Sequence, residues 1–85
     1  MQARNLSQSA TYETSDTPLA NWLSINGIKI LGINRRFSPA IISLDNSDFT
    51  RINDLITQWD SGNAIGNCVV FYKSYRMLIH RIKEG

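Results

Sequence analysis

The pattern of hydrophobic and polar positions separates a polar start from a longer, patterned region. Residues 1–11 are rich in Ser, Gln and Asn and show no hydrophobic period, so no burial offsets the entropy lost on ordering them. We expect a flexible polar arm over residues 1–11 and one compact domain over residues 12–85.

A short helix is predicted directly after this arm. Ser15, Asp16 or Thr17 can accept hydrogen bonds from the free N–H groups at its start. Pro18 is tolerated in the first turn because its missing N–H needs no partner there. The Asn-Gly pair at residues 26–27 can end the helix, since both residues accept a left-handed backbone. Its apolar stripe consists of Leu19, Trp22, Leu23 and Ile25.

A β-hairpin is the next predicted element. Residues 28–34 are rich in β-branched side chains, which favour strands, and Gly32 interrupts their alternation so that a bulge can reset the inward direction at Ile33. A polar turn over residues 34–38 leads to the second strand, where Pro39 is tolerated only near the start or on a sheet edge. The alternating positions of that strand are Ala40, Ile42 and Leu44.

Two longer helices are predicted in the second half of the chain. The first follows candidate caps at residues 45–48, and its apolar positions recur at spacings of three and four until Ser61-Gly62. These positions are Phe49, Ile52, Leu55, Ile56 and Trp59. A connector leads to the last helix, over residues 68–83, whose opening residues also have strand propensity. Its apolar face comprises Phe71, Tyr72, Tyr75, Leu78, Ile79 and Ile82.

These elements predict an α+β fold: a short helix, a two-stranded β-hairpin, and two helices packed on one face of the small sheet. A chain of 85 residues buries only about 60% of the surface its unfolded form exposes, so a large enclosed catalytic cavity is not expected. Trp22 and Trp59 are interpreted as core anchors rather than base-stacking platforms, because each lies on an apolar helical face.

Groups that commonly carry catalysis or bind metals are scarce. Cys68 is the only cysteine and His80 the only histidine, and they lie about three turns apart along the predicted last helix. Asp45 and Asp48 are interpreted as helix caps rather than a carboxylate pair. We therefore predict no enzymatic activity, no metal site and no cofactor.

Composition and charge permit several kinds of partner. Hydrophobic residues make up 42% and charged residues 19% of a chain with net charge +2 and a pI of about 9.0, which allows attraction to phosphate without requiring it. No run approaches the roughly 20 apolar residues of a membrane span, and the N-terminal residues lack the apolar core of a signal peptide. We expect a cytoplasmic protein without membrane contact, located in the host cytoplasm if its source is a virus.

Three short motifs lie between residue 12 and the first strand of the hairpin, ahead of the two later helices. They are Tyr12-x-Thr14-Ser15-Asp16, Leu19-Ala20-x-x-Leu23 and Gly27-x-Lys29-x-Leu31-Gly32. Over about residues 12–83 the chain resembles a small uncharacterised family, a domain of unknown function, found in phages and bacteria. It departs from that pattern at Gly66-Asn67-Cys68-Val69, where the family pattern has a Pro-containing helix start. The resemblance implies a compact domain from a mobile element, and it transfers no activity and no site residues.

Basic residues supply the main functional signal. At 100° per residue, the stripe of Lys73, Arg76, His80 and Lys83 covers about a quarter of the circumference of the last helix, beside its apolar face. Arg35 and Arg36 extend this stripe if the hairpin turn lies near the helix. The stripe has three interpretations: a solvated face, a contact with nucleic-acid backbone, or a contact with an acidic protein.

Two binding functions follow from these interpretations. The first is association with a DNA or RNA backbone through Arg35, Arg36, Lys73, Arg76, Arg81 and Lys83. No exposed aromatic residue is expected between these cations, which argues against sequence-specific binding of single strands. The alternative is a protein-binding accessory subunit or a phage-encoded modulator of a host complex, which uses a sheet edge beside Pro39 or the side chain of Met77. The oligomeric state is left open.

Overall fold

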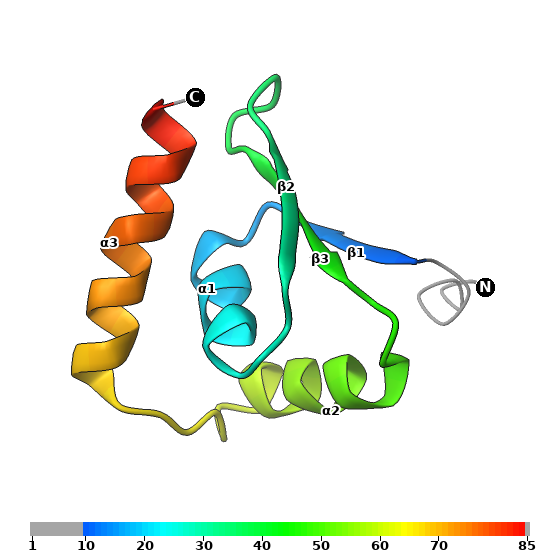
Figure 1. Ribbon diagram of the computed structural model, residues 1–85. Coiled ribbons are helices and arrows are strands. Elements are labelled where there is room, and N and C mark those ends of the chain that lie inside the picture. The colour runs from blue at the N-terminus through cyan, green and yellow to red at the C-terminus, as the bar shows by residue number, and fades with distance from the viewer. Residues whose placement is uncertain (1–9, 85) are drawn as a thin grey trace.

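The computed structural model describes residues 10–84 and confirms the α+β class (Figure 1). Its order of strands and helices is β1 (Thr11–Thr14), α1 (Thr17–Ile25), β2 (Ile30–Asn34), β3 (Ile41–Asp45), α2 (Phe49–Asp60) and α3 (Cys68–Glu84).

The sheet has three strands where two were predicted. Its order is β1-β3-β2, and both pairs are antiparallel, so β3 is the central strand. Strand β1 has only four residues, too few for a clear alternation in the sequence. Pairing with β3 places Tyr12 opposite Leu44 and Thr14 opposite Ile42, and thus gives these residues an inward face.

The polar arm was predicted to extend through residue 11, and this boundary is wrong at its end. Thr11 belongs to β1, and the carbonyl oxygen of Ala10 accepts a hydrogen bond of 3.0 Å from the backbone N–H of Asn46. The rest of the predicted arm, residues 1–9, lies outside the described residues.

The predicted bulge in β2 is confirmed. The register pairs Ile30 with Leu44 and Gly32 with Ser43, and the shift between them inserts one residue into β2. Because of this shift, Ile30 and Ile33 both pack against the core although their spacing is odd. Pro39 precedes β3 rather than lying on a sheet edge.

The ends of α1 and α2 agree with the predicted caps. The carboxylate of Asp16 accepts from the N–H of Leu19 at 3.1 Å, and that of Asp48 accepts from the N–H of Arg51 at 3.2 Å. Gly27 and Gly62 follow the two helices with φ of +94° and +80°, values that favour glycine.

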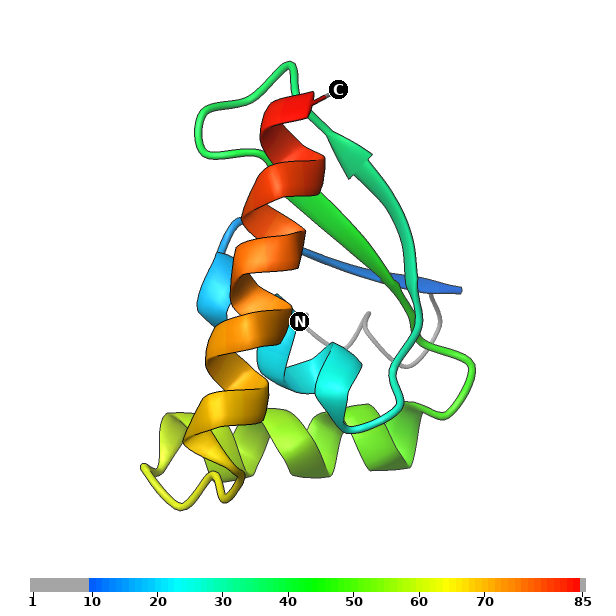
Figure 2. The same cartoon turned by 60° about the vertical axis from the view of Figure 1, so that its left-hand side comes forward.

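The layering of the helices differs from the prediction. Helix α1 lies against the sheet, and α3 packs on the side of α1 that faces away from the sheet, while α2 crosses below (Figures 1 and 2). The prediction that both later helices pack on the sheet is therefore wrong for α3. Since α1 is short and buried over most of its length, it can be covered on two sides.

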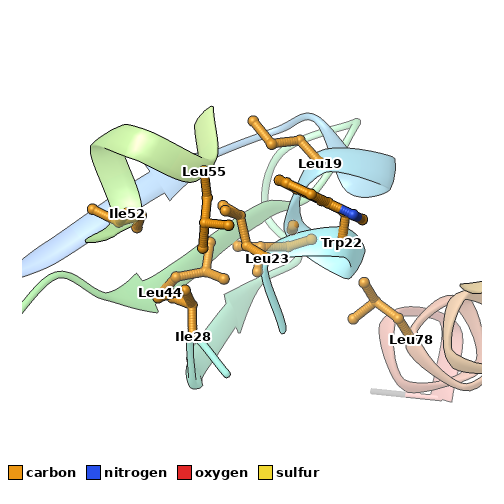
Figure 3. Packing of buried hydrophobic residues seen from close by; sticks show 10 residues of the cluster. Leu19, Trp22, Leu23, Ile28, Leu44, Ile52, Leu55 and Leu78 are labelled. Atoms are coloured by element: carbon orange, nitrogen blue, oxygen red, sulfur yellow. The ribbon is translucent and has the colours of Figure 1, made fainter. Parts of the chain in front are cut away.

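The core is formed where α1 meets its neighbours. Figure 3 shows Leu78 of α3 directed toward Trp22 of α1, while Ile52 and Leu55 of α2 approach Leu44. Trp22 is buried and Trp59 packs against the core, which confirms both as core anchors. None of the helices in the described part of the chain is long and apolar enough to span a membrane.

A buried polar contact joins α1 to α3. The side chain of Asn21 is fully buried, with 0% exposure. Its amide Nδ2 donates to the carbonyl oxygen of Phe71 at 3.1 Å, and its Oδ1 accepts from the hydroxyl of Ser74 at 2.6 Å. Together with Leu78, this contact fixes which side of α3 faces the body of the protein and which side faces solvent.

Candidate functional site

The predicted basic residues lie on α3 and on the loop between β2 and β3, residues 35–40, called here the hairpin loop. All of them are exposed. We call this set the basic face; its members are Arg35, Arg36, Lys73, Arg76, Arg81 and Lys83. Figures 1 and 2 both place the hairpin loop beside the C-terminal end of α3, so the tertiary structure brings the two parts of the basic face together.

Arg35 makes the connection between them. Its Nε donates to the carbonyl oxygen of Ile82 at 2.8 Å, and its Nη2 donates to that of Arg81 at 3.2 Å. These carbonyls belong to the last turn of α3, which carries a partial negative charge and whose carbonyl oxygens have no N–H partner within the helix. Arg35 thus positions the hairpin loop against α3 while keeping its positive charge.

The two edges of the stripe on α3 lie at different distances from the docked side of the helix. The docked side of the helix is centred on Phe71 and Leu78. At 100° per residue, Lys73 and His80 lie about 140–180° around the helix from these residues. These two residues point away from the protein, whereas Arg76 and Lys83, at the other edge of the stripe, line a hollow together with Tyr72 and Ile79 of the predicted apolar face.

The charges of the protein are strongly segregated. Six of the nine Lys and Arg residues lie on the basic face, but only one of the seven acidic residues, Glu84, lies on α3 or the hairpin loop. The other acids lie on the remaining strands, helices and connections: Glu13, Asp16, Asp45, Asp48, Asp54 and Asp60. The net charge of +2 does not show this separation, because opposite charges on different parts of the surface cancel in the sum.

Few contacts neutralise the basic face. Within residues 10–84, the one ion pair closer than 4.0 Å joins His80 Nε2 to Glu84 Oε2 at 3.7 Å, and both side chains are well exposed. An exposed pair of this kind contributes little to stability. The lysine and arginine charges of α3 therefore remain available to an external anion.

Two aromatic residues that the sequence did not point to lie among these cations. Tyr72, expected on the apolar face, is 60% exposed, and Phe37 in the hairpin loop is 56% exposed. The guanidinium of Arg76 lies over the ring of Tyr72, 5.8 Å from its centroid. The expectation that no exposed aromatic interleaves with the cations is therefore wrong. The sequence did contain a signal for an exposed Phe37, because this residue directly follows Arg35 and Arg36 in the predicted polar turn.

A groove runs between these aromatic residues. One hollow, of about 360 Å³, includes Tyr72, Arg76, Ile79 and Lys83 in its lining. A second hollow, of about 380 Å³, lies between α3 and the hairpin loop and includes Phe37, Ile79 and Lys83. Ile79 and Lys83 line both hollows, so the two lie next to each other, and together we call them the α3–hairpin groove.

Not every basic residue borders this groove. At 100° per residue, Arg81 lies about 160° around α3 from Lys83, and it lines a different hollow together with Lys73 and Met77. Arg36 lies in the hairpin loop, where its backbone N–H donates to Asn34 Oδ1 at 3.0 Å. The basic face thus has two flanks, and only one of them carries exposed aromatic rings.

A separate apolar hollow lies at the other end of α3. It has a volume of about 270 Å³, and Trp22, Trp59 and Phe71 are part of its wall, with the exposed Cys68 at its edge. The indole N–H of Trp22 donates to the carbonyl oxygen of Ile65 at 3.2 Å. The polar group of that ring is thus already paired, and the hollow offers mainly apolar surface.

Comparisons with other proteins add nothing to this geometry. No protein-family model, no curated protein and no solved structure matches the chain. The resemblance to an uncharacterised phage and bacterial family stays a prediction.

Proposed function

We propose that this protein is a small non-enzymatic binding protein that associates with nucleic-acid backbone through its basic face. The observation that carries the proposal is the segregation of charge, with six cations and one acid on α3 and the hairpin loop. Backbone contact requires several Lys and Arg residues on one surface and little else. The activity belongs in the cytoplasm, or in the host cytoplasm for a viral source.

The rigid support of α3 favours this proposal. The helix is held on α1 by the packing of Leu78 and by the hydrogen bond between Ser74 and Asn21. At its last turn, Arg35 donates a hydrogen bond to the carbonyl oxygen of Ile82. The cations are thus presented on a fixed scaffold, which lowers the conformational entropy lost when an anion binds.

Salt dependence of binding tests the proposal directly. Fluorescence anisotropy of labelled DNA and RNA oligonucleotides would be measured over a range of salt concentrations. If four of the six cations contact phosphates, log Kd is expected to rise with log salt concentration with a slope of roughly 3 to 4. Absence of binding at low salt, or an affinity that ignores salt, would contradict the proposal.

Two lysines provide a matched pair for the same titration. Lys83 lies on the basic face, whereas Lys29 is exposed outside it, just before β2. Lys83→Ala is expected to lower the salt slope by about 1 and to weaken binding to all sequences alike. Lys29→Ala should leave both the slope and the affinity unchanged. Equal losses in the two variants would mean that the basic face is not the binding surface.

A second candidate function is supported by the apolar end of α3. Ile65, which lines the apolar hollow, is 82% exposed, and Val69 and Val70 in the first turn of α3 are also exposed, as expected of a protein-binding accessory subunit or phage modulator. Exposed Met77 agrees with the sequence-based expectation. The predicted sheet edge beside Pro39 is wrong, because β3 is paired on both sides.

Affinity capture from the native host would test this alternative. A partner protein that is lost with Val69→Asp and retained with Lys73→Ala would favour the accessory role. A partner lost only with Lys73→Ala would instead place the contact on the basic face.

A further inference from the structure

We infer that the α3–hairpin groove binds single-stranded nucleic acid by stacking bases on Tyr72 and Phe37. This inference rests on the proposed function and selects one class of nucleic acid within it. The structural basis is the combination of exposed aromatic rings and cations along two adjoining hollows.

The two exposed aromatic residues favour unpaired bases over a duplex. A duplex keeps its bases stacked on one another and presents phosphates, sugars and base edges to a protein, so exposed rings gain little from it. An unpaired base has two free faces, and stacking on a protein ring is sequence-tolerant because every base has such a face. Tyr72 and Phe37 are more than half exposed, and both lie on the flank of the basic face that contains the groove.

Cations lie along the same groove as the two rings. Arg76 and Lys83 line the groove between the two rings, and Arg35 forms part of its wall. Each base of a single strand is joined to a phosphate, so a surface that binds both parts needs aromatic rings and cations close together. The order along the groove is ring, cation, cation, ring.

The length of the groove matches a short single strand. Tyr72 and Lys83 are eleven residues apart on α3, which corresponds to about 16 Å along a helix. At a stacked rise of about 3.4 Å per nucleotide, this distance accommodates roughly five nucleotides. Phe37 extends the track beyond the end of α3. The floor, formed in part by Ile79 and Ile82, is apolar, and it suits the bases rather than the phosphates.

Arg35 has a positioning role in this arrangement. Its two hydrogen bonds to Ile82 and Arg81 hold the hairpin loop beside α3, and the second half of the groove exists only where these segments meet. Phe37 and Lys83, which are distant in sequence, become neighbours along one track for this reason.

The test compares three labelled probes by fluorescence anisotropy at low ionic strength. These are an oligothymidine of about ten nucleotides, twice the estimated length of the groove, an oligouridine of equal length, and a DNA duplex of the same length. Both single strands are expected to bind at least about tenfold more tightly than the duplex. The two single-stranded probes also distinguish DNA from RNA, since a preference of either kind identifies the natural strand.

Substitutions then separate stacking from charge. Tyr72→Ala and Phe37→Ala are each expected to weaken single-strand binding by about tenfold, whereas Tyr72→Phe retains binding because stacking needs only the ring. Leu31→Ala is the matched control: Leu31 is half exposed in β2 and lines neither half of the groove. Circular dichroism confirms that each variant is folded.

The possible results separate this inference from the proposed function. The groove inference is overturned if binding depends on salt but the aromatic substitutions leave the affinity unchanged, or if the duplex binds more tightly than the single strands. Either result leaves backbone binding intact. Failure of all three probes to bind overturns both.

Discussion

The contact between α1 and α3 makes a quantitative prediction about stability. Asn21 is fully buried and uses both ends of its amide, toward Phe71 and Ser74. Replacement by alanine removes both hydrogen bonds and leaves the hydroxyl of Ser74 without this acceptor. We expect Asn21→Ala to loosen α3, since few other polar groups connect it to the body of the protein.

The magnitude follows from these bonds. Two neutral hydrogen bonds contribute about 1 kcal/mol each, and an unsatisfied, partly buried hydroxyl costs about 1 kcal/mol more, which gives a loss of about 2–4 kcal/mol. A domain of 85 residues has a total unfolding free energy of about 4–13 kcal/mol. The substitution therefore removes a large fraction of the stability.

Urea denaturation followed by circular dichroism and tryptophan fluorescence measures this loss. Ser74→Ala should cost about 1–3 kcal/mol alone and much less when Asn21 is already alanine, because the two substitutions remove the same bond. Asn53→Ala, at an exposed position of α2, is the control and should change stability by less than about 0.5 kcal/mol. A loss below about 1 kcal/mol for Asn21→Ala, or additive effects in the double variant, would refute the reasoning.

Three further predictions concern other parts of the structure. Arg35→Ala should destabilise the last turn of α3 by about 1 kcal/mol, visible as faster amide exchange confined to that turn; uniform exchange changes would count against it. Burial raises the pKa of Tyr12 above 10.0, so its stabilising contribution is complete below pH 10 and falls as the pH rises through the folded-state pKa. Tyr12→Phe should remove this component, and an unchanged pH profile of the unfolding free energy would exclude it. Leu78→Ala should cost about 2–4 kcal/mol in a urea titration, whereas Met77→Ala, one residue earlier on the exposed side, should be nearly neutral.

The sequence predicted most of the local structure correctly. The caps at Asp16 and Asp48, the glycines that follow α1 and α2, and the bulge at Gly32 all lie where the local chemistry indicated. These features depend on hydrogen bonds and backbone preferences within a few residues, so neighbouring positions contain the necessary information. The basic positions of α3 were found in the same way, from helical periodicity.

Strand β1 required tertiary information. A four-residue segment that begins in a polar stretch has no pattern of its own, and it becomes a strand only because β3 offers a free edge. The third layer formed by α3 has a similar origin, since periodicity shows that a helix has an apolar face but not which surface covers it.

The candidate site shows the same division. The sequence by itself determined the number of cations, their helical spacing and the scarcity of catalytic groups. Only the tertiary structure decided that Arg35 joins the hairpin loop to α3, that Tyr72 is exposed, and that Phe37 borders the same groove. The physical reason is that a groove depends on the relative placement of segments more than 30 residues apart in the chain, which local propensities do not encode.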